Sequence, residues 1–164
     1  MMRSKNLLIQ KKSPLSETTY LTGDTGILGS LKLPILQNSG YFKGKELYTF
    51  LSLDLFGNTY RIYKEGKSIG YIHLHAFRNL AQVNLVEEGP YQFSIHGLLK
   101  NNWSIRQGKK SLDVKDNDLF VHLIDTKEEE LITACGLFIA AKIKKDLIVF
   151  VPVIVMIWTL LIIF

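Results

Sequence analysis

Two histidines on one predicted strand come nearest to the spacing of a metal site. His73 and His75 alternate in YIHLH, so their side chains point to the same face of an extended strand. Zinc needs a third and usually a fourth ligand of the right type. No pattern in the sequence brings His96 or His122 next to this pair. Strand histidines that make ordinary hydrogen bonds are therefore the favoured interpretation, and we expect no metal site.

The other residue types that carry chemistry lack the patterns that metal binding or catalysis requires. Asp113, Asp116 and Asp118 lack the glycine and the distal glutamate of an EF-hand. The glycines of GDTGILG match neither a dinucleotide-binding fingerprint nor a P-loop. Cys135 stands among apolar neighbours that disfavour its thiolate, and no serine stands in a nucleophile elbow. We therefore expect a protein that is not an enzyme and that has no cofactor.

Basic side chains are the remaining candidates for a binding site. The chain has a formal net charge of +5, and every charged residue precedes Leu147. A basic surface suits anionic lipid or nucleic acid. Aromatic residues that would stack on bases fall on alternating strand positions that a barrel interior also needs, which disfavours nucleic acid. Scattered, solvated charges are the alternative interpretation. We predict contact with anionic phospholipid through six residues: Lys142, Lys144, Lys145, Arg106, Lys109 and Lys110.

The last eighteen residues are the most apolar segment of the chain. Residues 147–164 read LIVFVPVIVMIWTLLIIF and contain no charge. As a helix they would span about 27 Å, close to the roughly 30 Å hydrocarbon core of a bilayer. Lys142, Lys144 and Lys145 precede the run, as expected at the cytoplasmic boundary of a membrane. We predict a membrane anchor at 147–164 and a body that faces the cytoplasm, where a single cysteine also fits. A buried core helix is the alternative.

Alternating apolar and polar residues predict a body of short strands before residue 126. In ELYTFLSLDLF, one face of the strand carries Leu47, Thr49, Leu51, Leu53 and Leu55. Turn signals rich in Gly, Asn and Asp separate such runs at intervals of roughly 8–12 residues. This spacing predicts about ten to twelve strands, joined as consecutive hairpins in a sandwich or barrel.

The periodicity becomes helical after residue 126. Thr126 and Glu129 fit a capping box with Thr126 as the N-cap. The segment 131–141, LITACGLFIAA, is apolar on all sides and rich in small residues. A helix of this kind must be buried, and at about 16 Å it is too short to cross a bilayer. It predicts a slim helix threaded through a barrel of strands.

This arrangement resembles the tubby C-terminal-like superfamily, which includes the LURP-one-related and phospholipid scramblase families. The resemblance rests on the hairpin series ELYTFLSLDLFGNTYRIYKEGKSIGYIHLHAF, the strand–turn–strand YQFSIHGLLKNNWSIRQG and the helix EEELITACGLFIAAKI. It implies a twelve-stranded barrel closed around one apolar helix, and contact with phospholipid. The phosphoinositide-binding motif of the family has no match in this chain, so the resemblance assigns no ligand residues.

Taken together, these patterns predict a chain of two parts. Residues 1–143 are expected to form a mainly β, antiparallel barrel of about twelve strands around a central helix at about 127–143. Residues 147–164 are expected to form a second apolar helix, the membrane anchor. The predicted function is a non-enzymatic, membrane-anchored module that binds or scaffolds at lipid.

Three alternatives to this function stay open at the level of sequence. The first is a soluble barrel whose last eighteen residues are the buried core helix. The second is a lipocalin-like carrier or enzyme with an internal ligand. The third is a scramblase-like protein that translocates lipid. The sequence indicates no particular protein partner.

Overall fold

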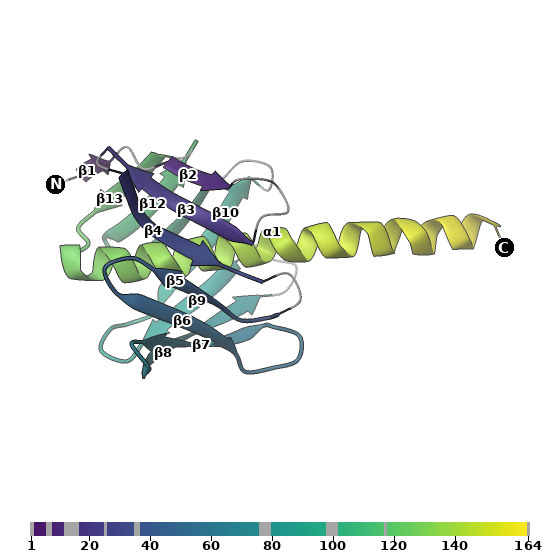
Figure 1. Cartoon of the computed structure of the whole chain (residues 1–164), viewed down its shortest axis with the longest axis horizontal. Coiled ribbons are helices and arrows are strands. Elements are labelled where there is room, and N and C mark those ends of the chain that lie inside the picture. Colours follow the sequence, from purple (N-terminus) through teal and green to yellow (C-terminus); the bar gives the residue numbers. More distant parts are fainter. Residues whose placement is uncertain are drawn as a thin grey trace.

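A curved antiparallel sheet and one long helix make up the computed structural model of the chain (Figure 1). Side chains are described for most of the strands and for the helix as far as Leu147. The structure describes residues 2–5, 8–11, 17–24, 26–34, 37–75, 80–97, 102–116 and 118–163.

The sheet is built from consecutive hairpins, as the alternating sequence predicts. Each strand pairs antiparallel with its neighbours, and the order across the sheet is β1-β13-β12-β11-β10-β9-β8-β7-β6-β5-β4-β3-β2. The described residues form thirteen strands: β1 (Met2–Lys5), β2 (Leu8–Lys11), β3 (Thr18–Gly23), β4 (Gly26–Lys32), β5 (Gly40–Lys43), β6 (Leu47–Ser52), β7 (Thr59–Lys64), β8 (Lys67–His75), β9 (Leu80–Leu85), β10 (Tyr91–Gly97), β11 (Asn102–Gln107), β12 (Lys110–Lys115) and β13 (Asp118–His122). The mainly β, antiparallel fold is therefore confirmed.

The prediction of a closed barrel is wrong, because no hydrogen-bonded pairing joins the two edge strands of the sheet in the described part of the chain. β1 pairs with β13, whereas β2 pairs with β3. These two edge strands follow each other in the chain and are separated only by residues 6 and 7. The two halves of one N-terminal segment thus bond to opposite edges instead of to each other. The sheet wraps around the helix without forming a continuous ring of hydrogen bonds (Figure 1).

A single continuous helix, α1 (Thr126–Ile163), stands where the sequence predicts two. The polar stretch between the two apolar segments, KIKKD at 142–146, contains neither Gly nor Pro, so nothing in it breaks a helix. It also supports one, because Lys142 and Asp146 pair one turn apart. At the start of the helix, the N–H of Glu129 donates to the Asp125 carbonyl at 2.9 Å. The N-cap is therefore Asp125, one residue before the predicted Thr126.

The core of the molecule is the part of α1 that lies inside the sheet. Residues 132–140 are all buried, which confirms the predicted buried helix. The helix contacts β11 and the neighbouring strands β4 and β5, which lie far from β11 in the sheet order. Phe138 stacks on Phe50 with ring centroids 4.3 Å apart and meets Tyr60 edge-on at 4.9 Å. A helix without a polar face is stable here because the sheet covers it on all sides.

The leucines that alternate along β6 lie on the outside of the sheet. Tyr48 and Phe50 are buried, whereas Leu47 and Leu51 are 43% and 42% exposed. The alternation of ELYTFLS therefore predicts the strand correctly, and the aromatic residues occupy the inner face. The alternating leucines of the outer face continue past the end of β6 as Leu53 and Leu55, in the connection to β7.

Removal of the Phe138 ring tests the core. We expect Phe138→Ala to lower the free energy of unfolding by about 3–5 kcal/mol, because it leaves a cavity between Phe50 and Tyr60. The matched control is Phe56→Ala, which removes a ring that is 83% exposed and should change stability by less than about 0.5 kcal/mol. Urea unfolding in a mild detergent measures both. Equal losses in the two variants would contradict the buried position of α1.

Candidate functional site

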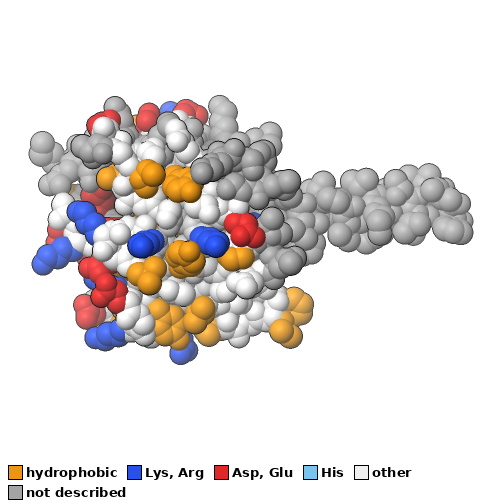
Figure 2. All heavy atoms as spheres, in the orientation of Figure 1, with side chains coloured by type: hydrophobic (Ala, Val, Ile, Leu, Met, Phe, Trp, Pro, Cys, Tyr) orange, Lys and Arg blue, Asp and Glu red, His pale blue; other side chains and the backbone are white. Residues whose placement is uncertain are grey.

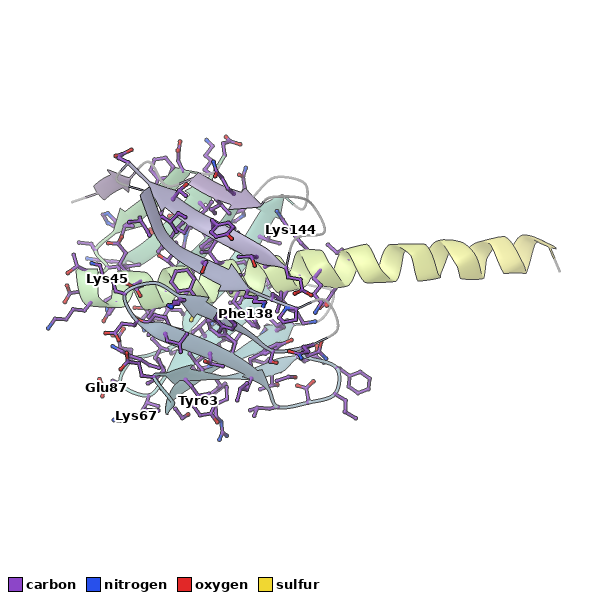
Figure 3. All side chains as sticks on the ribbon, viewed as in Figure 1. Lys45, Tyr63, Lys67, Glu87, Phe138 and Lys144 are labelled. Atoms are coloured by element: carbon purple, nitrogen blue, oxygen red, sulfur yellow. The ribbon has the colours of Figure 1, made fainter. Side chains whose placement is uncertain are left out.

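The two ends of the sheet differ in how they meet α1. We call the turns at 44–46, 86–90 and 108–109, near the beginning of the helix, the start rim. There the Glu130 carboxylate accepts the backbone N–H of Glu46 at 2.9 Å. We call the connections at 33–34, 37–39 and 53–58, from which the helix projects, the exit rim. Figure 3 shows Lys45 and Glu87 at the start side and Lys144 at the exit side, with Phe138 between them.

The six predicted lipid-binding residues divide between these rims. Lys142, Lys144 and Lys145 lie on the helix at the exit rim, whereas Arg106, Lys109 and Lys110 lie at the start rim. Lys110 contacts Glu128, which is 14 residues before Lys142, or about 21 Å along the helix axis. The structure does not bring the six residues together, so a flat bilayer surface meets only one of the two groups.

Two of the three exit-rim lysines hold the helix in place. The Lys142 side chain is 3% exposed and its ammonium pairs with the Asp146 carboxylate. The Lys145 ammonium donates to the carbonyls of Pro34, at 2.7 Å, and Gln37, at 2.8 Å. Burial, and then the charge of Lys142, lower the pKa of Lys145. Lys145 therefore fastens α1 to the connection between β4 and β5, whereas the Lys142–Asp146 pair supports the helix itself.

The start rim contains a network in which one ammonium lies between two carboxylates. Lys110 Nζ lies 3.2 Å from Glu88 Oε2 and 2.9 Å from Glu128 Oε2. The Tyr91 hydroxyl donates to Glu88 at 2.9 Å and lies 3.3 Å from Glu128. Contact with Glu88 raises the pKa of Glu128, and the same contact lowers the pKa of Glu88. Glu128 is therefore the carboxylate of the pair that takes up a proton first as the pH falls.

Lys110 is accordingly a structural cation that neutralises this pair. Its bond with Glu128 raises the pKa of the ammonium. Arg106, one of its predicted companions, pairs with Asp113 at 2.9 Å on the exposed outer face. Lys109 is exposed in the turn between β11 and β12 and has no ion pair or hydrogen bond among the described residues.

The paired histidines make contacts of the ordinary kind. The rings of His73 and His75 meet edge-on, with centroids 5.0 Å apart, on the outer face of β8. His73 Nδ1 lies 3.3 Å from the Thr59 hydroxyl, and His96 Nε2 lies 2.9 Å from the Ser104 hydroxyl. No group of three His, Cys, Asp or Glu residues able to hold a metal occurs in the part of the chain whose side chains are described.

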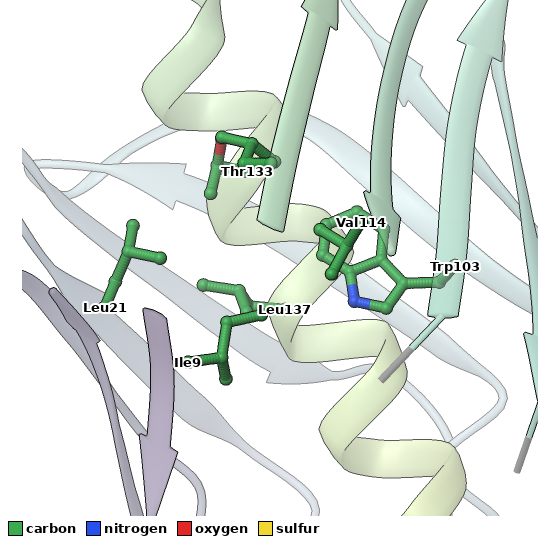
Figure 4. A pocket seen from close by; sticks show the side chains of 7 residues that line it. Ile9, Leu21, Trp103, Val114, Thr133 and Leu137 are labelled. Atoms are coloured by element: carbon green, nitrogen blue, oxygen red, sulfur yellow. The ribbon is translucent and has the colours of Figure 1, made fainter. Parts of the chain in front are cut away.

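A narrow void lined by described residues lies between the helix and the sheet (Figure 4). It has no room for a water molecule. Its lining is almost entirely apolar: Ile9, Leu21, Trp103, Val114, Leu119, Thr133 and Leu137. Trp103 also packs so closely on the helix that a Cβ on Gly136 would collide with its ring. The void therefore does not favour an internal ligand.

The exit rim has an apolar feature that the sequence interpretation did not assign to a site. Leu55 and Phe56, in the connection between β6 and β7, are 92% and 83% exposed. Figure 2 shows orange side chains at the edge of this connection, on the side from which the helix projects. The signal in the sequence was LDLFGN, where apolar residues continue past a strand into a turn. Turns are usually polar, so this composition indicates a surface with a function.

No protein-family model, curated protein or solved structure matches the chain.

The predicted anchor falls mainly on residues outside those whose side chains are described. The helical backbone continues to Ile163, but the described side chains end at Leu147. Within the portion described, no helix is long and apolar enough to cross a membrane.

Replacement of Lys110 tests the start-rim network. We expect Lys110→Met to lower the free energy of unfolding by about 1 kcal/mol at pH 7, because two partly exposed carboxylates then face each other. The folded-state pKa of Glu128 rises further in this variant. Stability from its protonated form is therefore present below pH 4.5 and is lost as pH rises, so the deficit shrinks on acidification.

Urea unfolding between pH 4 and pH 8 measures this dependence. The matched control is Lys109→Met, which removes the neighbouring exposed ammonium and should leave stability unchanged at each pH. A deficit in Lys110→Met that stays constant with pH would refute the raised pKa of Glu128.

Proposed function

We propose that this protein is a membrane-anchored module without catalytic activity, which binds or scaffolds at the cytoplasmic surface of a lipid bilayer. Residues 147–164 are the anchor, and the sheet with residues 126–146 is the body. Membership of the tubby C-terminal-like superfamily is part of the same proposal.

The continuity of α1 is the observation that carries this proposal. One helix runs from the buried core at 132–140 to Ile163, without a linker between body and tail. Residues 147–164 contain fourteen Leu, Ile, Val or Phe residues among eighteen. At roughly −0.3 to −0.6 kcal/mol each, these residues favour insertion by about 4–8 kcal/mol before the cost of Pro152. A helix that is fixed in the body would also fix how the body stands on the bilayer.

The packing of the core weighs against the soluble alternative. In that alternative, the last eighteen residues fill the sheet and residues 131–141 lie elsewhere. Residues 132–140 already occupy this position, with Phe138 against Phe50 and Tyr60. Lipid translocation has no supporting observation in the described residues.

Truncation after Leu147 tests the anchor. We expect full-length protein to remain in the membrane pellet after a high-salt wash, because the tail is held by apolar burial. The variant lacking 148–164 keeps the core helix and the Lys142–Asp146 pair, so it should fold and appear in the supernatant. Circular dichroism checks its folding. A folded truncation that stays in the pellet would contradict the proposal.

A substitution in the full chain separates tail chemistry from tail length. Val155→Lys with Met156→Lys costs about 5–7 kcal/mol at the centre of a spanning helix, enough to offset most of the gain. This double variant should also leave the membrane, whereas the matched Val155→Leu with Met156→Leu should stay. If truncation unfolds the protein instead, the soluble alternative regains support.

Contact with anionic phospholipid is the second component of the proposal, and Lys144 is its main candidate. The Lys142 side chain is 3% exposed, whereas Lys144 is a partly exposed helix residue next to the predicted membrane boundary. A basic residue at an anionic surface contributes about 1 kcal/mol, or about fivefold in affinity. We expect Lys144→Gln to lower the preference of reconstituted protein for spin-labelled phosphatidylserine over phosphatidylcholine by about this factor. Lys109→Gln, at the other rim, should not change it.

A further inference from the structure

We propose that the connection between β6 and β7 inserts its apolar tip into the surface of the bilayer, as a second contact beside the helix. The tip consists of Leu55 and Phe56, which are 92% and 83% exposed. This inference rests on the proposed membrane anchoring, and it deepens that proposal by naming the part of the body that touches lipid.

The composition of this connection suits the boundary between headgroups and acyl chains. Residues 53–58 read LDLFGN, and Leu53 is also 51% exposed. Single exposed apolar residues are common on protein surfaces, whereas three in one short connection form a patch. The only charge in the connection is Asp54.

Hydrogen bonds turn the Asp54 carboxylate away from the tip and give the connection a defined shape. The carboxylate accepts the backbone N–H groups of Asn58, at 3.0 Å, and Thr59, at 2.6 Å. These bonds, that of Asn58 first, lower the pKa of Asp54. Leu53 N–H donates to the Thr59 carbonyl at 2.8 Å, which closes the base of the connection. The connection therefore already has this shape before it meets lipid, so binding loses little conformational entropy.

Contacts across the exit rim fix the tip relative to α1. The Asn38 side-chain amide donates to the Leu55 carbonyl at 3.3 Å, and Lys145 bonds the neighbouring Gln37 carbonyl. Gly57, with a φ of 66°, packs so tightly that a Cβ there would lie 2.6 Å from the Tyr60 hydroxyl and 3.3 Å from Lys142 Cε. The tip and the base of the projecting helix thus both bond to residues 37–38 at the exit rim (Figure 1).

This placement favours lipid over a protein partner as the occupant of the tip. The uncharged part of α1 begins at Leu147, five residues or about 8 Å beyond Lys142. If that part enters the bilayer, the exit rim lies against the headgroups. Apolar side chains at this level bury about 5–10 Å deep, at the headgroup–acyl boundary.

Site-specific fluorescence in vesicles tests the contact on the full chain. Three single variants, Phe56→Cys, Lys109→Cys and Met156→Cys, are labelled with an environment-sensitive fluorophore and reconstituted into phosphatidylcholine vesicles with or without nitroxide-labelled lipid. Native Cys135 does not compete, because it is fully buried and burial raises the pKa of its thiol. We expect lipid-borne nitroxide to quench the label at 56 about threefold more strongly than the label at 109, as for a probe at the interface.

The label at 156 makes the outcomes distinguishable. Quenching at both 56 and 156, with none at 109, supports the inserted tip and the anchor. Quenching at 156 alone overturns the inserted tip and leaves the anchor standing. The same conclusion holds if the label at 56 is then shielded from water, because a protein partner and not lipid covers it. Quenching at 56 alone supports the tip without the anchor, and quenching at neither position overturns both proposals. Thermal unfolding of Phe56→Cys checks that the exposed substitution leaves the fold intact.

Discussion

Burial of an apolar helix inside a curved sheet is the interaction on which the rest of the structure depends. Residues 132–140 have no polar face, so only a sheet that covers them from all directions can stabilise them. Phe138, between Phe50 and Tyr60, joins the helix to two strands that are themselves hydrogen-bonded neighbours. Small residues such as Gly136 let the Trp103 ring approach the helix backbone. The curvature of the sheet and the path of the helix are therefore consequences of one packing problem.

The same burial decides what the charged residues at each rim do. At the start rim, Glu128 and Glu88 share Lys110, which neutralises the first turn of a helix that must enter an apolar interior. At the exit rim, Lys142 and Lys145 satisfy their ammonium groups with a carboxylate and with backbone carbonyls. A buried ammonium without such partners would be costly. These cations are thus needed by the fold itself, and they fix the direction in which α1 leaves the sheet.

Local periodicity made much of this fold predictable from sequence. The alternation around Tyr48 and Phe50, and the apolar segment at 131–141, each reflect one element and its burial. The sequence predicts two helices because KIKKD is polar, but a polar stretch does not by itself break a helix. Partners such as Lys145 and Pro34, 111 residues apart, depend on the tertiary fold, so the sequence did not show which lysines the fold itself uses.

This distinction changes the physics of the proposed membrane contact. Lys142 is buried and Lys145 bonds inside the protein, so Coulomb attraction would be only one part of the contact at the exit rim, and salt screens it within about 10 Å. Apolar burial is not screened in this way and would act on Leu55, Phe56 and the projecting helix together. Because the tip and the helix both bond to residues 37–38, the entropy of orienting the body would be lost once, when the helix inserts. Burial of the tip would then add favourable free energy with little further loss of entropy. Contact at two points would therefore be more favourable than contact at either point alone.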